Sequence, residues 1–324
     1  MKIDVMPDRR QLSAEALSPE GLNPKANFFL VGAPRAGTTS VDRVLRDHPQ
    51  VFLSPIKEPC HFCPDIAEQM ARKPARMRRI ESSYLASSRK ELIHLSWVSS
   101  SDDYSRLFDG AAGHRIVGEC STYYLSSKIA PKSIHAYNPQ ARILILVRRP
   151  IDRIRSHYAM DRSLGNTDRP LLSLVEDELA LGEDANWGNC HFYVGASRYS
   201  RQVAEFRRYF PPEQVCVLSF EQLVASPGTE LLKLFGFLGI AVLPQPPDLP
   251  RENKSRAARF PWLHHELRGS GLKPFVNGLL KHSLSGPAGK IMKSVYYRKD
   301  VRVVSDEELE KVDQLLASGG LDQQ

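Results

Sequence analysis

The segment VGAPRAGTTS, residues 31–40, stands at the end of the apolar run NFFLV and decides the fold prediction. Its glycines, Gly32 and Gly37, have the spacing of the phosphate loop G-x-x-x-x-G-K-[ST] that holds ATP or GTP. Thr38 occupies the position of the lysine, and the basic residue Arg35 lies inside the loop instead. The pattern predicts a buried strand, a phosphate loop and a helix, with a ligand other than a nucleoside triphosphate.

A glycine-rich turn at a helix N-terminus offers backbone N–H groups and the positive end of the helix dipole to a phosphate. Thr38 is too short to reach the β- and γ-phosphates as lysine does, whereas Arg35 can neutralise a group attached to the first phosphate. The loop therefore suits one phosphate. A glycine turn without a ligand is the alternative, and the strand and helix patterns on either side favour the phosphate site. The candidate contacts are Arg35, Ala36, Gly37, Thr38, Thr39 and Ser40.

A second basic stretch, LVRRPIDRIRSHY at residues 146–158, follows the apolar run RILILV. Arg148 stands at the carboxyl end of this predicted strand, where open parallel sheets bind ligands. Ser156 lies eight residues on, two turns into the predicted helix, so the two residues are candidates for a second phosphate. The other arginines are expected only to coat the helix surface: Arg149, Arg153 and Arg155.

Apolar runs and helix-period segments alternate along the chain. Strands are expected at 28–31, 115–118, 142–147 and 214–220, and helices at 40–48, 104–108, from 150, and at 203–210, 229–238 and 306–316. RILILV is apolar throughout, as expected for a strand buried on both faces of a parallel sheet. The alternation predicts an α/β, P-loop-like three-layer fold with a central parallel sheet flanked by helices.

The same pattern predicts a flexible polar lead-in over residues 1–26 and a single domain over 27–324. Within that domain, residues 65–95 carry a basic cluster without clear periodicity and are expected to form a variable, partly helical insertion. Residues 243–250 are rich in proline and are expected to form a surface loop.

The composition is that of an ordinary globular chain of 324 residues, with 42% hydrophobic and 25% charged residues. The formal net charge of +7 suits an anionic cofactor or acceptor, although nucleic acid, an acidic membrane surface or a merely solvated basic surface would fit it too. No stretch approaches the ~18 apolar residues of a membrane span. The polar N-terminus and the five cysteines favour a cytoplasmic, reducing compartment over a disulfide framework.

Together, these motifs resemble the sulfotransferases that use 3′-phosphoadenosine 5′-phosphosulfate (PAPS). VGAPRAGTTSV is similar to their 5′-phosphosulfate loop, and LVRRPIDRIRSHY to their 3′-phosphate motif. KEPCHF, residues 57–62, and GECSTYYL resemble segments typical of the heparan-sulfate-like and bacterial branch, and SFEQLVASPGTELLKLFGFLGI also fits. The resemblance covers roughly residues 27–240.

This resemblance implies PAPS as the sulfuryl donor, without a metal. Arg35 falls at the basic position of the 5′ loop, where lysine is commoner, and Arg148 and Ser156 fall at the two 3′-phosphate positions. Glu58 matches the catalytic glutamate and is the expected general base, with Arg35 stabilising the leaving phosphate. The loop expected to close over the nucleotide site comprises residues 243–262, in which Arg256 and Arg259 are basic.

Two positions depart from the family pattern. Cys60 replaces the usual histidine, which appears one place later as His61, and Cys120 replaces a frequent lysine. His61 is therefore kept as a second candidate base. Cys60 and Cys63 form a C-x-x-C pair, but a second such pair is lacking, and buried thiols are favoured over a zinc site.

Two other classes of protein stay open on the sequence. A P-loop kinase or NTPase would need the missing lysine and an acidic residue where Arg148 stands. A non-enzymatic binder of anionic polymers would not need Glu58 beside two phosphate sites. The sulfotransferase prediction includes an acceptor hydroxyl on a glycan, lipid or small metabolite, no nucleic-acid partner and no membrane span, and leaves the oligomeric state undetermined.

Overall fold

The structure is a computed structural model that describes residues 24–71, 84–85, 87, 91–243, 256–258, 297–299 and 304–318. The chain divides into two compact units. The first unit comprises Met1–Arg148 and Tyr199–Pro250, and the second comprises Arg149–Arg198 and Arg251–Gln324. The sequence assigns residues 27–324, which include most of both units, to one domain. That single-domain assignment stays a prediction.

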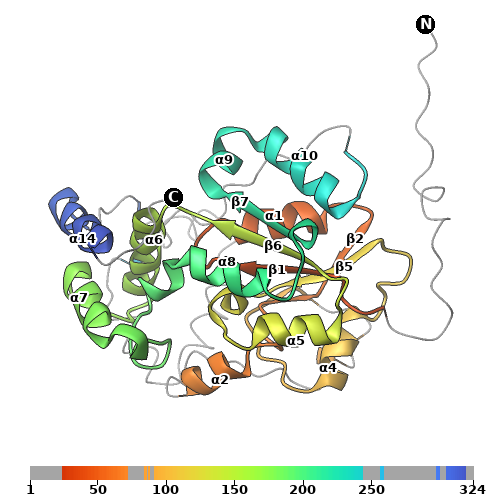
Figure 1. Ribbon diagram of the computed structural model, residues 1–324, viewed down its shortest axis with the longest axis horizontal. Helices are drawn as coiled ribbons and strands as arrows, with labels where there is room; N and C mark the ends of the chain where they lie inside the picture. The colour runs from red at the N-terminus through yellow and green to blue at the C-terminus, as the bar shows by residue number, and fades with distance from the viewer. Residues whose placement is uncertain are drawn as a thin grey trace, which may run out of the picture. The chain divides into compact units, whose positions relative to one another are not determined.

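The first unit is built on a five-stranded sheet in the order β2-β5-β1-β6-β7, in which every neighbouring pair is parallel (Figure 1). The strands are β1 (Phe28–Gly32), β2 (Val51–Leu53), β5 (Ile116–Cys120), β6 (Arg142–Val147) and β7 (Val215–Ser219). Every residue of β1 and β5 is buried, as expected for interior strands of a parallel sheet covered on both faces. The predicted parallel α/β sheet is confirmed.

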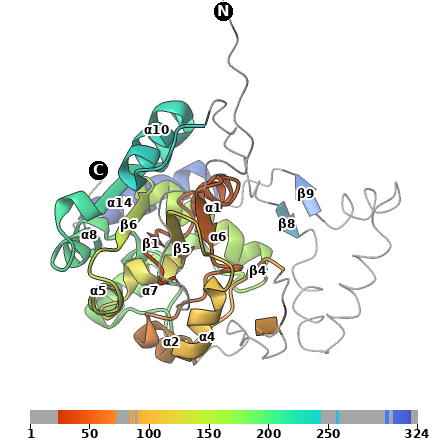
Figure 2. The same cartoon turned by 90° about the vertical axis from the view of Figure 1, so that its right-hand side faces the viewer.

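Helices cover both faces of this sheet. Figures 1 and 2 show α1 (Thr38–Arg46) and α10 (Pro227–Leu238) on one side and α4 (Ser101–Ser105) and α5 (Ala130–Tyr137) on the other. The remaining elements are β3 (Ile56–Lys57), α2 (Pro64–Ala71), β4 (Ile93–His94), η2 (Arg106–Phe108), η3 (Thr122–Ser126), α8 (Tyr199–Arg207), η6 (Pro212–Gln214) and α9 (Phe220–Ala225). The resulting three layers are those of the predicted P-loop-like architecture.

Two glycines allow the tight connection between β1 and α1. Gly37 has a φ of 88°, and a Cβ atom there would lie 2.6 Å from the Phe220 ring. A Cβ at Gly32 would lie equally close to the Leu125 side chain. Any other residue at either position would clash with packed neighbours, so the glycine spacing seen in the sequence is a steric requirement of this loop.

Several boundaries differ from those read off the sequence. The helix expected at 40–48 begins at Thr38, and the strand expected at 115–118 continues to Cys120. Strand β2 is only three residues long, too short for a periodic signal. In the 65–95 insertion, α2 and β4 are ordered elements at its two ends, while residues 72–83 lie outside the described residues.

The second unit contains α6 (Pro150–Ser163), α7 (Leu171–Leu181), η4 (Gly182–Asp184), η5 (Gly195–Ser197), β8 (Arg256–Ala258), β9 (Tyr297–Lys299) and α14 (Asp306–Ser318). Its core joins apolar residues of α6, α7 and α14, including Ile154, Val175 and Val312. Strand β8 lies inside the range 243–262 expected to form a loop and pairs antiparallel with β9. The rest of that range, including Arg259, lies outside the described residues apart from its first residue.

The expectation that three arginines coat α6 is correct for two of them and wrong for Arg153. Arg149 and Arg155 are 68% and 51% exposed and both pair with Asp152. Arg153 is fully buried. Its Nε donates to Ser197 Oγ at 2.6 Å, and its Nη2 donates to the Tyr193 carbonyl. The loop before α8 covers this face of α6, so the arginine is a buried link rather than a surface charge.

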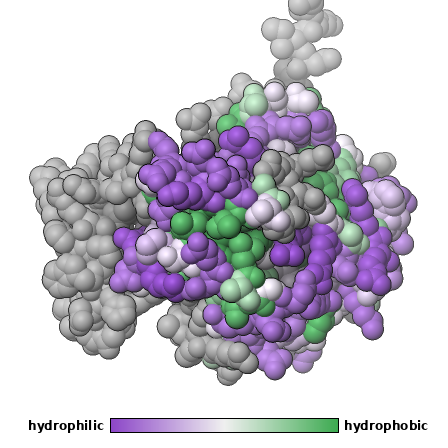
Figure 3. All heavy atoms as spheres, turned by 60° about the vertical axis from the view of Figure 1, so that its left-hand side comes forward, coloured by the Kyte–Doolittle hydropathy of each residue, from purple (hydrophilic) through white to green (hydrophobic). Residues whose placement is uncertain are grey.

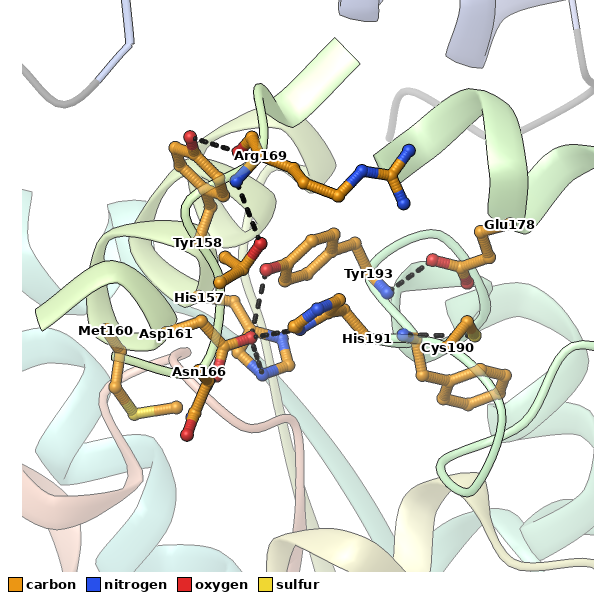
Figure 4. Close-up of polar contacts among 12 residues, drawn as sticks. His157, Tyr158, Met160, Asp161, Asn166, Arg169, Glu178, Cys190, His191 and Tyr193 are labelled. Carbon is orange, nitrogen blue, oxygen red and sulfur yellow. Dashed lines mark hydrogen bonds and ion pairs between the residues drawn. The ribbon is translucent and has the colours of Figure 1, made fainter. Parts of the chain in front are cut away.

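A buried polar network continues from this link (Figure 4). Asp161 Oδ2 accepts hydrogen bonds from the Tyr193 hydroxyl and His191 Nδ1, both at 2.9 Å. The Asn166 side chain donates to Asp161 Oδ1 at 2.7 Å. Glu178 of α7 accepts the backbone N–H of Tyr193 at 2.6 Å. These contacts fasten the loop around residues 190–195 to α6 and α7.

Most residues on the face drawn in Figure 3 are hydrophilic, with a smaller hydrophobic area near its centre. The large apolar side chains are concentrated in the cores, and the fully buried ones include Phe28, Phe108, Phe206 and Phe235. Over the described residues, none of the helices has the length and apolar character needed to cross a membrane.

Candidate active site

The candidate residues of the first unit gather at the carboxyl ends of four neighbouring strands. Arg35 follows β1, Thr122 follows β5, Arg148 follows β6 and Phe220 follows β7. The order β5-β1-β6-β7 makes these strands direct neighbours, and parallel strands end at the same edge of a sheet. Glu58 joins them, because its backbone N–H donates to the Cys120 carbonyl at 2.7 Å.

The loop after β1 and the motif after β6 are in contact. Arg148 Nη1 donates to the Arg35 carbonyl at 3.1 Å. Arg35 has a φ of 70°, and the Ala36 N–H donates to the Ala33 carbonyl at 3.1 Å, which closes a tight turn. The positive end of the α1 dipole lies at this loop and the charged Arg148 side chain contacts it, so both favour an anion here.

Sequence reasoning missed Phe220, which packs against both parts of this anion site. The Arg148 guanidinium lies over the Phe220 ring, 4.6 Å from its centroid. The same ring occupies the space that a side chain at Gly37 would need. Phe220 is the last residue of the strand expected at 214–220, and this place at the carboxyl end of a strand was the available signal. The ring gives Arg148 a flat support and thereby restricts its orientation.

The Glu58 carboxylate is buried and fixed by donors from two directions. Thr122 donates its backbone N–H to Oε2 at 2.6 Å, and its hydroxyl lies 3.0 and 3.1 Å from the two carboxylate oxygens. Lys57 Nζ lies 3.1 Å from Oε1. Thr122, sixty-four residues away in sequence, is a second residue that sequence reasoning missed. These contacts hold one orientation of the carboxylate.

Lys57 is also buried, with a side chain 5% exposed. Burial alone would lower the pKa of Lys57, but the acidic groups around it, which include Glu58 and Asp42, outweigh burial, and the net shift is upward. Because burial raises the pKa of the Cys120 thiol, that group keeps its proton at neutral pH. The carboxylates of Glu58 and Asp42 are therefore the charges that keep Lys57 protonated.

The turn that carries Glu58 has an unusual backbone. Glu58 and Cys60 have φ values of 67° and 53°, in the left-handed region that non-glycine residues seldom adopt. The Cys60 N–H donates to Ser121 Oγ at 3.0 Å. Residues in such conformations persist where their surroundings hold them in place and are common at functional sites.

His61, the other candidate base, lies in the same turn and is half-buried. Its Nδ1 lies 2.8 Å from the Val98 carbonyl, and its ring stacks on Tyr104 with centroids 4.3 Å apart. Burial lowers the pKa of His61. If Nδ1 donates to Val98, the neutral ring has Nε2 as its proton acceptor.

The three cysteines near this turn are buried thiols, as the sequence indicates for Cys60 and Cys63. Burial raises the pKa of Cys60, Cys63 and Cys120. The Cys63 thiol lies 3.5 Å from the Cys60 carbonyl oxygen. In the described part of the chain, no group of three or more His, Cys, Asp or Glu side chains is arranged to hold a metal ion.

Ser156, the second residue of the predicted 3′-phosphate pair, lies on α6 of the second unit and is half-buried. Arg148 ends the first part of the first unit. Each residue is thus described within its own unit, and their pairing stays a prediction of the sequence motif.

A model of the sulfotransferase family matches residues 27–244, more than half of the chain. The chain therefore belongs to the sulfotransferase family. A solved structure of a sulfotransferase from Alicyclobacillus acidocaldarius is 27% identical and has a TM-score of 0.57, over 78% of this chain and 92% of that one. The family assignment and the P-loop-like fold predicted from the sequence are confirmed.

Two curated relatives are named for sugar substrates. Human heparan sulfate glucosamine 3-O-sulfotransferase 6 is 30% identical over 148 residues, which is 45% of this chain and 40% of that protein. Rat carbohydrate sulfotransferase 15 is 22% identical over 247 residues, which is 67% of this chain and 44% of that protein. The chain thus spans less than half the length of these two relatives.

Proposed function

We propose that this chain transfers the sulfuryl group of PAPS to a hydroxyl group of an acceptor. The observation that carries the proposal is a fixed, buried carboxylate, Glu58, at the same sheet edge as the start of α1 and the Arg148 side chain that contacts the Arg35 carbonyl. Sulfuryl transfer needs both features, since a proton must leave the acceptor hydroxyl while negative charge grows on the leaving phosphate.

The residues present fit PAPS better than a nucleoside triphosphate. Thr38 is buried at the position where a P-loop carries its lysine, so a triphosphate tail would lack its usual clamp. PAPS supplies the sulfuryl group when bound and has a single phosphate in its 5′ chain. The loop N–H groups, the hydroxyls of Thr39 and Ser40, and Arg35 are the proposed contacts to that phosphate. Arg148 and Ser156 are the proposed contacts to the 3′-phosphate.

Glu58 is the proposed general base. Thr122 and Lys57 orient its carboxylate, and Lys57 stays protonated beside it. Glu58 takes the hydroxyl proton as the acceptor oxygen bonds to sulfur and the bond from sulfur to the phosphate oxygen breaks. Arg35 neutralises the charge that this leaves on the phosphate, and adenosine 3′,5′-bisphosphate is the second product.

His61 is the competing base. Its lowered pKa keeps the imidazole neutral at neutral pH, which a proton acceptor requires. Glu58 is preferred because its orientation is fixed by a cation and by two groups of Thr122. The two assignments differ in which substitution stops the reaction, and the paired variants in the Discussion separate them.

The proposed acceptor is a sugar hydroxyl. Support comes from the names of the relatives, which specify heparan sulfate glucosamine and carbohydrate as what those proteins sulfate. The basic cluster at residues 72–79, which suggested an anionic glycan, lies outside the described residues.

The direct test is transfer of labelled sulfuryl from PAPS to a panel of acceptors: heparan-type oligosaccharides, neutral sugars, a phenol and an aliphatic alcohol. We expect product with at least one sugar acceptor. Product only with the phenol or the alcohol would keep the reaction but remove the sugar assignment.

A ligand-binding measurement tests the class of protein without an acceptor. Adenosine 3′,5′-bisphosphate should raise the thermal midpoint of the chain, because a ligand that binds the folded state stabilises it. ATP with Mg²⁺ should raise the midpoint less, because the triphosphate clamp is missing. Stabilisation by ATP with Mg²⁺ alone would instead favour the NTPase alternative.

A further inference from the structure

Glu119 of β5 is a fully buried carboxylate beneath the Glu58 turn, and the mechanism above does not use it. Three hydroxyl groups donate to it. Ser121 donates to Oε2 at 2.7 Å, Tyr124 donates to Oε1 at 2.6 Å, and Tyr104 reaches the same Oε1 at 3.4 Å. The carboxylate is thus the common acceptor of hydroxyls from the residue after β5, from η3 and from α4.

Two of these hydroxyls also hold the backbone that follows Glu58. Ser121 Oγ accepts the Cys60 N–H at 3.0 Å, and the Tyr124 hydroxyl oxygen accepts the Phe62 N–H at 3.3 Å. A hydroxyl has one hydrogen to donate. Because that hydrogen points at Glu119, the oxygen lone pairs are directed to the backbone N–H groups. An ionised Glu119 can only accept hydrogen bonds, so it fixes the orientation of both the Ser121 and the Tyr124 hydroxyl.

We propose that Glu119 is a positioning residue for proton transfer by Glu58. Its ionised carboxylate orients Ser121 and Tyr124, these hydroxyls hold the backbone at Cys60 and Phe62, and the held backbone keeps the left-handed turn that aims the Glu58 side chain. This inference rests on the proposed role of Glu58 as the base. It means that the reaction needs Glu119 in its ionised form, although the Glu119 carboxylate does not contact the substrate.

The electrostatic surroundings place this ionisation near neutral pH. Burial raises the pKa of Glu119 to about 7, and the neighbouring Glu58 raises it as well, while hydrogen bonds from Tyr124, Ser121 and Tyr104 oppose the rise. The titratable groups that face Glu119 are Glu58, Cys60, Cys63, Tyr104, Cys120, Tyr124 and Tyr137. The turn is therefore held more firmly as the pH rises past this value, and turnover should rise with it.

Glu119→Gln is the central variant. Its amide nitrogen must face either Ser121 or one of the tyrosines, and it donates where an acceptor is needed, so one hydroxyl must reverse and lose its proper contact with the backbone. We expect kcat to fall by roughly 10- to 100-fold, as for a misplacement of the reacting group. Binding of adenosine 3′,5′-bisphosphate should stay near the wild-type value. The rise of kcat with pH around 7 should disappear.

Single-hydroxyl variants locate the effect and remain informative if Glu119→Gln does not fold. Tyr124→Phe and Ser121→Ala each remove one link to the turn and should each lower kcat. Tyr104→Phe removes a donor to the same carboxylate at a longer distance and should cost less than Tyr124→Phe. Wild-type kcat in both Tyr124→Phe and Ser121→Ala would overturn the proposal.

Combination with Glu58→Gln separates positioning from general destabilisation. If Glu119 acts through Glu58, adding Glu119→Gln to Glu58→Gln should cause little further loss of kcat. An equal further loss would overturn the positioning role. Normal turnover of Glu58→Gln alone would refute the proposed base, whereas a severe loss in Glu58→Gln with none in Glu119→Gln would refute only the role of Glu119.

Discussion

Each compact unit buries a glutamate that holds a loop, and the two sites differ in their donors. Glu119 in the first unit accepts only neutral hydroxyls in its described contacts. Glu178 in the second unit accepts the backbone N–H groups of Tyr193 and Gly195 at 2.6 and 2.8 Å, with the Arg153 charge nearby. Burial raises the pKa of both groups.

The difference in donors gives the two carboxylates different uses. At Glu178, backbone N–H groups and then the Arg153 cation oppose the effect of burial on the pKa. At Glu119 the opposing groups are uncharged hydroxyls, the nearby Glu58 adds to the rise, and the pKa reaches about 7. A buried carboxylate with a cation at hand suits fixed architecture, whereas one held by hydroxyls can titrate in the range where an enzyme works.

The largest expected effect is the loss of turnover when Glu58, in the first unit, is replaced. Glu58→Gln keeps the shape of the side chain but cannot accept the acceptor proton, so kcat should fall by roughly 10²–10⁴, or about 2.7–5.5 kcal/mol of barrier. Binding of adenosine 3′,5′-bisphosphate, measured by calorimetry, should hardly change. His61→Ala is the matched variant and should be the milder one. A severe loss in His61→Ala with a mild loss in Glu58→Gln would exchange the two roles.

The next largest effect is on stability and concerns Arg153, the cation near Glu178 in the second unit. Arg153→Met leaves Glu178 buried without its nearby cation and breaks the links to Ser197 and Tyr193. We expect the free energy of unfolding to fall by about 3–5 kcal/mol, because the Ser197 and Tyr193 oxygens lose a buried charged donor and Glu178 loses its nearby cation. Urea unfolding of the full chain measures this, with the exposed Arg155→Met as a control that should change stability by about 0.5 kcal/mol at most. Equal losses would show that burial of Arg153 is not what matters.

The pH dependence of stability tests the titration of Glu119 separately from its effect on turnover. Its pKa is raised from 4.5 to about 7, so its contribution to stability is fully present below pH 4.5 and is lost as the pH rises through 7. The shift corresponds to roughly 3 kcal/mol. Urea unfolding between pH 4 and pH 8 should show this decline in the wild type and a smaller decline in Glu119→Gln. The same decline in both proteins would mean that Glu119 does not titrate in this range.

The smallest effect concerns ligand binding. Arg148→Ala should weaken binding of adenosine 3′,5′-bisphosphate by about 10- to 150-fold, or roughly 1.5–3 kcal/mol, the value of a charge-assisted hydrogen bond. Binding of adenosine 5′-phosphate should change much less. Equal weakening for both nucleotides would show that Arg148 supports the loop, through the Arg35 carbonyl, rather than the 3′-phosphate.

Local sequence patterns predicted the framework of the first unit. The run at β6 has the predicted bounds, and the spacing of Gly32 and Gly37 gives the β1 loop and the start of α1. These features are readable because burial on both faces requires an unbroken apolar strand and because a tight loop requires glycine at fixed places. The short strand β2 and helix α5 lack such signals and were not foreseen.

The candidate site was only partly predictable. Sequence motifs indicate Glu58, Arg35 and Arg148, but they indicate no role for Thr122, Phe220 or Glu119. Thr122 is a neutral residue whose importance comes from a partner sixty-four positions away. Phe220 reads as an ordinary apolar residue until its ring is found against Arg148.

The sequence by itself determined which chemical groups stand at the carboxyl ends of the strands, since strand ends and loops follow from local hydrophobic patterning. Only the tertiary structure decided what those groups contact. It turned Arg153 from an expected surface charge into a buried link, and it placed three hydroxyls on Glu119. The physical reason is that burial, charge pairing and the direction of a hydroxyl depend on neighbours that are distant in sequence. Local hydrophobic periodicity carries no information about those neighbours.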